Sequence, residues 1–191
     1  MLFRSWGDYE VNREIYPGGR DSLKRVVDAI HEAGLAAGLH TYAFFIAKDT
    51  PWVSPVPDPR LDSRDVFNLA ADLPEDETTI TVEESTAGIS PITGFQVRNS
   101  ATLWIDDELI VFGAVETEPP YGFRGCVRGA HGTRPDRHAK GAEVRQLKEC
   151  FGLFVPRGDS TLFTDVAQCT ADLYNGCGFD MLYLEIGRAH V

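Results

Sequence analysis

The chain has 191 residues, of which 43% are hydrophobic, and a formal net charge of -11. This length suits one domain, or a domain with a small insert, but is too short for a complete (β/α)8 barrel of about 250 residues. The negative charge disfavours nucleic acid and anionic membranes as partners, because both require concentrated lysine and arginine.

Membrane segments, metal sites and cofactors are not expected. No apolar run approaches the roughly 20 residues that span a bilayer, and residues 1–4 do not resemble a signal peptide. We therefore expect a soluble protein, whose compartment the sequence does not indicate. The four cysteines contain no CxxC pair, which argues against a zinc site.

The first part of the chain has the pattern of half an α/β unit. Residues 1–20 form a polar and aromatic loop, and apolar residues at helical spacing then predict a helix over 21–33. The mostly apolar segment 35–46 predicts a buried strand. Four prolines in 47–73 impose an extended loop, with a short helical turn expected at 66–71.

Residues 74–148 change to an all-β pattern, which predicts an inserted small barrel or sandwich. Segments 102–105 and 108–112 flank Asp106-Asp107 and predict a hairpin. In the loop 128–141, the spacing of Arg128, His131 and His138 matches no standard metal site. The acidic residues 106–108 lack the EF-hand pattern of a calcium site. We therefore expect both groups to lock turns and loops. Other short strands are expected at 78–82, 94–97, 123–127 and 142–147.

Residues 149–185 return to the α/β pattern, with a predicted helix that Asn175-Gly176 ends. The apolar run 181–184 predicts a parallel strand buried on both faces, and it leads directly to Glu185. A carboxylate at the C-terminal end of a parallel strand is where a (β/α) barrel keeps its catalytic groups. The order αβ, all-β, αβ indicates a small β domain inserted into a parallel α/β fold.

Two segments carry a resemblance to a known family. YPGGRDSLKRVVDAIHEAGLAAGLH at 16–40 and GFDMLYLE at 178–185 resemble the sequences around the third and fourth barrel strands of the α-galactosidase-like (melibiase-type) glycoside hydrolases. The resemblance implies the fold class α/β, a partial (β/α)8 TIM barrel with an inserted all-β domain. Residues 1–73 and 149–185 would then form barrel segments, and residues 74–148 the insert.

The same resemblance implies a retaining mechanism in which the aspartate that ends the fourth strand is the nucleophile. Glu185 stands at that position here, and Tyr183 replaces the lysine of the family pattern. The resemblance therefore implies membership of this broad clan of glycoside hydrolases, but not its specificity for galactose. The acid/base partner is expected on a later strand, outside this sequence, so the chain by itself is expected to be inactive.

The insert has a resemblance of its own. IDDELIVFGAV at 105–115, GCVRGAHGT at 125–133 and HAKGAEV at 138–144 are similar to a recurring small β module of phage structural proteins and carbohydrate-associated proteins. The module is common and implies no particular chemistry.

The last residues, IGRAHV at 186–191, resemble a translated sequencing adapter when they are joined to Glu185. We therefore expect 186–191 to be non-native. In that case only the first base of codon 185 is native, and the native residue expected there is aspartate.

The candidate site residues lie around the two α/β strands. Glu185 is the candidate nucleophile, and polar or aromatic side chains that hydrogen-bond and stack on a sugar are the candidate binding residues. For His40, a core histidine remains the alternative. Asp180 and His31 are expected to be structural. The candidate substrate-binding residues are His40, Tyr42, Trp6, Asp8 and Tyr183.

The functional hypothesis is a fragment of a retaining glycoside hydrolase whose partner is a carbohydrate substrate. The alternative is a non-catalytic carbohydrate-binding or structural protein that uses the β insert as its binding module. Aromatic residues exposed on the insert would favour that alternative. A third hypothesis is a barrel enzyme of different chemistry, because fold does not determine function.

Overall fold

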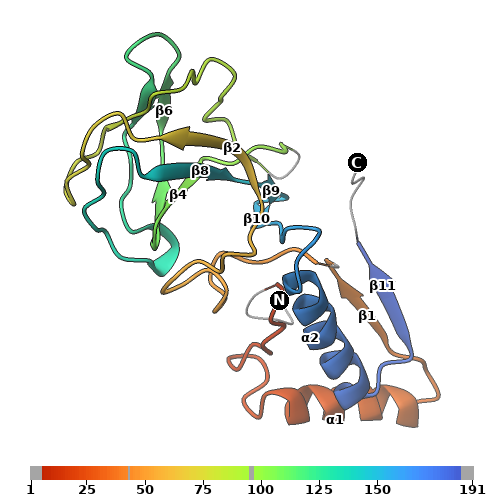
Figure 1. The fold of residues 1–191 in the computed structure, drawn as a ribbon. Coiled ribbons are helices and arrows are strands. Elements are labelled where there is room, and N and C mark those ends of the chain that lie inside the picture. Colours follow the sequence, from red (N-terminus) through yellow and green to blue (C-terminus); the bar gives the residue numbers. More distant parts are fainter. Residues whose placement is uncertain (1–5, 43, 95–96, 186–191) are drawn as a thin grey trace.

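The computed structural model describes residues 6–42, 44–94 and 97–185. Figure 1 shows two parts joined by several connecting segments. The part that contains both helices, with residues 6–42 and 155–185, is called the α/β part below. The part that contains residues 63–148 is called the β part.

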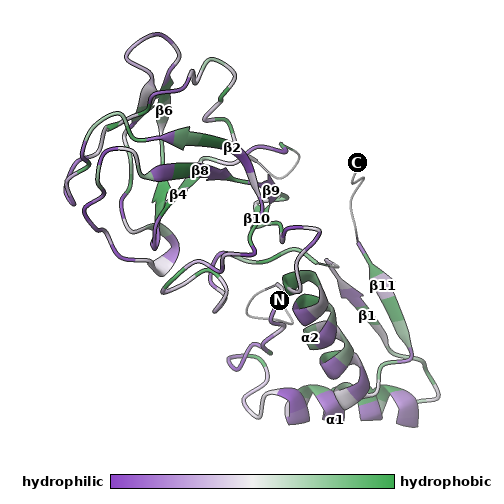
Figure 2. Ribbon diagram, viewed as in Figure 1, coloured by the Kyte–Doolittle hydropathy of each residue, from purple (hydrophilic) through white to green (hydrophobic). Residues whose placement is uncertain are grey.

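Two helices form the body of the α/β part. α1 spans Arg20–Glu32 and buries Leu23 and Val27, which lie one turn apart on a single face. The rest of α1 is mostly hydrophilic (Figure 2). α2 spans Leu162–Cys177 and packs against α1. Within the described residues, neither helix is long and apolar enough to cross a membrane.

α2 ends later than the sequence predicts. The helix continues through the expected stop at Asn175-Gly176 and ends at Gly178, which has φ 79° and accommodates the left-handed conformation without a side-chain clash. Its buried residues recur every three or four positions and define one apolar face. These residues are Leu162, Val166, Thr170, Leu173 and Cys177.

Strands β1 (Gly38–Thr41) and β11 (Met181–Leu184) form a two-stranded parallel sheet. Leu39 of β1 belongs to the same buried cluster as the helix faces, whereas His40 points to the opposite, open face. The two candidate strands are therefore parallel neighbours. All four residues of β11 are nonetheless exposed.

The predicted partial (β/α)8 TIM barrel with an inserted all-β domain is wrong. The described residues contain only two helices, the parallel sheet has two strands, and every other strand pair is antiparallel. The strand predicted over 35–46 stops at Thr41. Ile46 instead exchanges backbone hydrogen bonds with Phe154, at 2.9 and 2.8 Å, which turns the chain out of the sheet.

The β part contains two antiparallel sheets that share one buried core. One sheet has the order β2-β8-β4-β5 and the other β3-β7-β6. Both supply the core, including Leu103, Ile110 and Phe123. The strands are β2 (Ser63–Asn68), β3 (Ile80–Thr81), β4 (Thr102–Ile105), β5 (Glu108–Val111), β6 (Ala114–Glu116), β7 (Gly122–Arg124) and β8 (Glu143–Leu147), with a 3-10 turn η1 at Ala130–Gly132.

The predicted hairpin around Asp106-Asp107 is confirmed, because β4 and β5 pair across these two residues. The helical turn predicted at 66–71 is wrong. Residues 66–68 belong to β2, where Val66 is exposed and Phe67 is buried, and β2 pairs with β8. Leu69, which follows, is buried and forms an isolated β-bridge with Val82. The boundary at residue 73 stays a prediction, and the sheet already includes residues on its N-terminal side.

A short hairpin connects the two parts. β9 (Glu149–Cys150) and β10 (Leu153–Phe154) are antiparallel and flank Phe151-Gly152. The hydrophobic cluster of the α/β part continues through this junction, because Phe154 and Trp104 belong to it. The two parts therefore share buried contacts at the junction.

Candidate functional site

The open face of the parallel sheet carries a pair of facing aromatic side chains. His40 of β1 is in register with Tyr183 of β11, and their ring centroids lie 4.9 Å apart. His40 is exposed, and Tyr183 is 55% exposed. Both rings are therefore accessible to a ligand that approaches this face.

Trp6 and Tyr42 extend this pair beyond the end of β1. The Tyr42 ring lies 6.1 Å from the His40 ring and 4.9 Å from the Trp6 ring, which meets it edge to face. The Tyr9 hydroxyl donates a hydrogen bond to the Tyr42 backbone carbonyl at 3.1 Å, which fixes the chain at this point. Both Trp6 and Tyr42 are half-buried.

Glu185 lies at the same end of the sheet. Its backbone N–H donates to the Thr41 carbonyl at 2.8 Å, which continues the ladder between the strands by one residue. The Tyr183 hydroxyl donates to Glu185 Oε2 at 3.3 Å. The carboxylate is therefore held beside Tyr183 at the carboxyl ends of both strands. We call Trp6, His40, Tyr42, Tyr183 and Glu185 the aromatic site.

Asp8 is a predicted site residue on the loop between Trp6 and Tyr9. Its Oδ1 accepts a hydrogen bond from the Glu10 backbone N–H at 3.3 Å. Burial raises the pKa of the Cys169 thiol, and the negative charge of Asp8 adds to that rise. The tail predicted as non-native, 186–191, lies outside the described residues.

Phe151 lies beside the aromatic site, although the sequence pattern does not identify it as a candidate site residue. Its ring lies 5.7 Å from the Tyr42 ring and 5.8 Å from the Phe45 ring. The segment after residue 150 reads as a plain apolar strand, which gives no reason to single out its first residue. The only sequence signal is Gly152, which marks a turn next to this phenylalanine.

Asp180 and His31 have structural roles, as expected. Asp180 Oδ2 accepts hydrogen bonds from the Ala37 backbone N–H at 2.7 Å and from His31 Nε2 at 2.8 Å. The backbone N–H of Ala37, followed by His31, lowers the pKa of Asp180. This carboxylate joins the start of β11 to the segment before β1, at the opposite end from Glu185.

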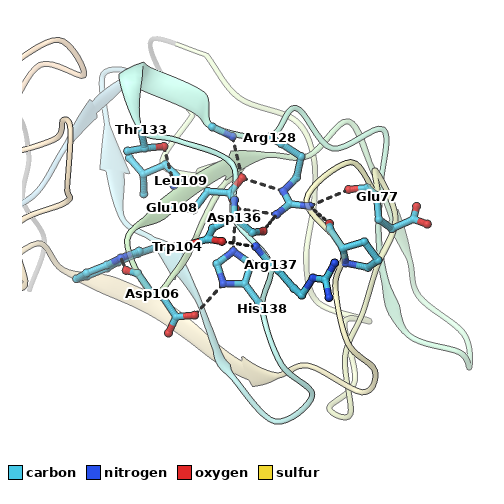
Figure 3. Close-up of polar contacts among 12 residues, drawn as sticks. Glu77, Trp104, Asp106, Glu108, Leu109, Arg128, Thr133, Asp136, Arg137 and His138 are labelled. Atoms are coloured by element: carbon cyan, nitrogen blue, oxygen red, sulfur yellow. Dashed lines mark hydrogen bonds and ion pairs between the residues drawn. The ribbon is translucent and has the colours of Figure 1, made fainter.

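Glu108, Arg128 and His138 form a buried polar cluster in the β part. This cluster is called the lock below, because it fixes loops of the β part to one another. Glu108 is fully buried, and its two carboxylate oxygens accept hydrogen bonds from Arg128, His138 and the backbone (Figure 3). The backbone donors are the N–H groups of Gly129 and Asp136, at 2.8 and 3.2 Å. Arg128, His138 and Glu108 therefore lock turns as predicted, whereas the His131 ring lies 5.7 Å from the Phe154 ring. In the described part of the chain, no group of three or more His, Cys, Asp or Glu is arranged to hold a metal ion.

The lock also perturbs the ionisation of its members. Burial alone would raise the pKa of Glu108, but the hydrogen bonds from His138, Arg128 and the backbone outweigh it and lower the pKa to about 2. Burial would lower the pKa of His138, but its contacts with Glu108 and Asp106 raise it. Glu108 is therefore an ionised structural carboxylate with no face open to a substrate.

No family model, curated protein or solved structure matches this chain.

Proposed function

We propose that the aromatic site binds a neutral carbohydrate and that the chain is part of a retaining glycoside hydrolase, with position 185 as the nucleophile. The observation that carries the proposal is the carboxylate of Glu185 beside the exposed Tyr183 ring, at the carboxyl ends of two parallel strands. The barrel itself forms no part of this proposal.

The side chains of the aromatic site suit a sugar ring. Sugars present apolar C–H faces that pack on aromatic rings, and hydroxyl groups that need directed donors and acceptors. Trp6, Tyr42 and Tyr183 supply rings, and His40 supplies two ring nitrogens. The aromatic site contains no lysine or arginine, and the whole chain has a net charge of -11. Both facts favour a neutral sugar over a uronic acid or a sulfated sugar.

The proposed chemistry is a substitution at the anomeric carbon. One oxygen of the carboxylate at 185 forms a bond to that carbon, while the bond to the leaving-group oxygen breaks and its electron pair departs with the leaving group. The Tyr183 hydroxyl holds the carboxylate in one orientation. A retaining enzyme uses a second carboxyl group about 5–5.5 Å away as acid/base. We assign that role to no described residue.

The test uses probes that need no acid catalyst. 2,4-Dinitrophenyl 2-deoxy-2-fluoroglycosides carry a leaving group that departs as the anion, so a nucleophile alone is sufficient to form the glycosyl-protein ester. A panel of α and β gluco, galacto and manno probes is incubated with the full chain, and intact mass is measured. We expect one probe to add a single fluoroglycosyl group, which peptide mapping locates at residue 185.

Three variants sharpen this test. Glu185→Gln removes the nucleophile and should abolish labelling, while Glu185→Asp restores the expected native residue and should retain it. Glu143→Gln is the matched control, because Glu143 is an exposed carboxylate of the β part. Labelling that persists in Glu185→Gln would exclude position 185 as the nucleophile.

The alternative, a binding module in the β part, receives no support from exposed rings. Among the residues described between 63 and 150, Phe67, Trp104, Phe112 and Phe123 are buried and Tyr121 is half-buried. No second function is proposed.

A further inference from the structure

Phe151 adopts a backbone conformation that is unusual for its residue type. It has φ 56° at the first position of the two-residue turn between β9 and β10, and Gly152 follows with φ 76°. Positive φ at both central residues is the pattern of a type I′ hairpin turn, where asparagine, aspartate and glycine are preferred. For a bulky residue this conformation is an outlier, because the Cβ approaches the backbone too closely.

Contacts on both sides of the hairpin impose the turn. On β10, Phe154 exchanges two backbone hydrogen bonds with Ile46. On β9, the buried Glu149 Oε1 accepts hydrogen bonds from Ser100 at 2.6 Å and Thr102 at 3.0 Å. The segment that follows β1 and the β part therefore both anchor the hairpin. A residue in a rarely populated conformation persists only where its surroundings fix it in this way.

The same conformation sends the ring of Phe151 to the aromatic site. The ring contacts Tyr42, which is itself 4.9 Å from Trp6. Phe151 is only half-buried, so its packing against Tyr42 and Phe45 leaves part of the side chain accessible. An asparagine at this position would satisfy the turn better but would present no ring. The turn chemistry alone therefore does not explain this residue.

We infer that Phe151 is a substrate-contacting residue that the β9–β10 hairpin supplies to the aromatic site, where its ring stacks on the apolar face of the bound carbohydrate. This inference rests on the proposed function. It adds an aromatic side chain from the junction with the β part to a site whose other members come from residues 6–42 and 183–185. Phe151 positions no reacting group, so its effect is on affinity.

The test separates the effect of the aromatic ring on binding from the effect of the turn on stability. Phe151→Asn removes the ring and suits the left-handed turn, while Phe151→Leu retains apolar bulk and the unfavourable conformation but lacks the aromatic face. The probes are the methyl α- and β-glycosides of glucose, galactose and mannose, titrated into the full chain by calorimetry. The comparison uses the glycoside that wild type binds most tightly, and the melting temperature of each variant is recorded.

Both variants should weaken binding by about twofold to tenfold, which corresponds to the contribution of one aromatic contact. The melting temperature of Phe151→Asn should equal or exceed that of Phe151→Leu, because asparagine tolerates the turn. Phe151→Tyr, which keeps the ring, should bind as wild type does. Phe163→Ala is the matched control, since Phe163 is an exposed aromatic residue of α2 that contacts Phe44 outside the aromatic site.

The outcomes distinguish this inference from the proposed function. If Tyr42→Ala weakens binding while Phe151→Asn and Phe151→Leu bind as wild type does, the inference is overturned and the carbohydrate site stands. If wild type binds none of the six glycosides, both are overturned. If Phe151→Asn weakens binding and Phe151→Leu does not, apolar bulk at this position is sufficient for binding. The inference that the ring stacks on the sugar is then overturned.

Discussion

The aromatic site and the lock of the β part both centre on a carboxylate, and they differ in what surrounds it. Glu108 is fully buried, and four groups donate hydrogen bonds to it. Glu185 is partly exposed and lies beside Tyr183, a residue that is more than half exposed. A carboxylate saturated by the protein stabilises the fold, whereas one with accessible rings around it has room for a ligand.

The largest expected effect comes from breaking the lock. Glu108→Gln leaves the buried Arg128 guanidinium without its ionic partner, since the two side chains are 0% and 6% exposed. Removing one partner of a buried pair costs about 3–5 kcal/mol of unfolding free energy. Urea denaturation measures this loss. The control Glu143→Gln should change stability by less than about 1 kcal/mol, as is usual for a surface pair. Equal losses of unfolding free energy in Glu108→Gln and Glu143→Gln would contradict the structural role assigned to Glu108.

The lock should also make stability depend on pH. The stabilisation from ionised Glu108 is complete above its ordinary pKa of 4.5 and is lost as pH falls toward its folded-state pKa of about 2. Because one pKa unit corresponds to about 1.4 kcal/mol, the loss should reach about 3 kcal/mol. His138 has a raised pKa, so its contribution is complete below 6.5 and is lost as pH rises through the higher folded-state value.

Urea midpoints between pH 2 and pH 9 test both limits. Wild type should be most stable between them, and His138→Asn should lose the decline on the alkaline side. A wild-type midpoint that stays constant between pH 4.5 and pH 2 would contradict the ionised lock.

Glu185→Gln should have the opposite profile to Glu108→Gln. It should abolish labelling by the fluoroglycoside while it changes the free energy of unfolding by less than about 0.5 kcal/mol, because the side chain is partly exposed. A large loss of stability would show that Glu185 belongs to the fold in the way that Glu108 does.

The smallest effect on function is expected from Asp180→Asn. Asp180 lies on the same chain segment as Glu185 but at the opposite end of β11, where it joins His31 to Ala37. Labelling should stay within about twofold of wild type, with a lowered melting temperature from the weakened contact to Ala37. Abolished labelling in a folded Asp180→Asn chain would move the functional carboxylate to the other end of the strand.

Local patterns in the sequence predict local structure well in this chain. The apolar spacing in α1 and the hairpin at Asp106-Asp107 each follow from residues close to the element concerned. The parallel pairing of the last strand with β1 joins distant segments, and only the family resemblance implied it. The structural roles of Asp180 and Glu108 were also expected from their positions. The grouping of His40 and Tyr183 required only that the two strands be neighbours.

Features set by distant contacts were not predictable in the same way. The apolar run Met181–Leu184 indicates a strand buried on both faces, yet Met181 is 61% exposed, because an apolar run does not determine how many strands pack around it. The sequence predicts a helical turn where part of β2 lies, because the partner strand β8 is some 75 residues away in the sequence. The ring of Phe151 reaches Tyr42 only through a left-handed turn that its own sequence disfavours.

The most direct test of the central claim is the site at which a 2-deoxy-2-fluoroglycoside labels the full wild-type chain. A single added fluoroglycosyl group, mapped to residue 185 and absent from Glu185→Gln, is the result predicted for a nucleophilic carboxylate in the aromatic site. A label on another carboxylate, or no mass increase from any probe in either wild type or Glu185→Asp, would contradict the claim.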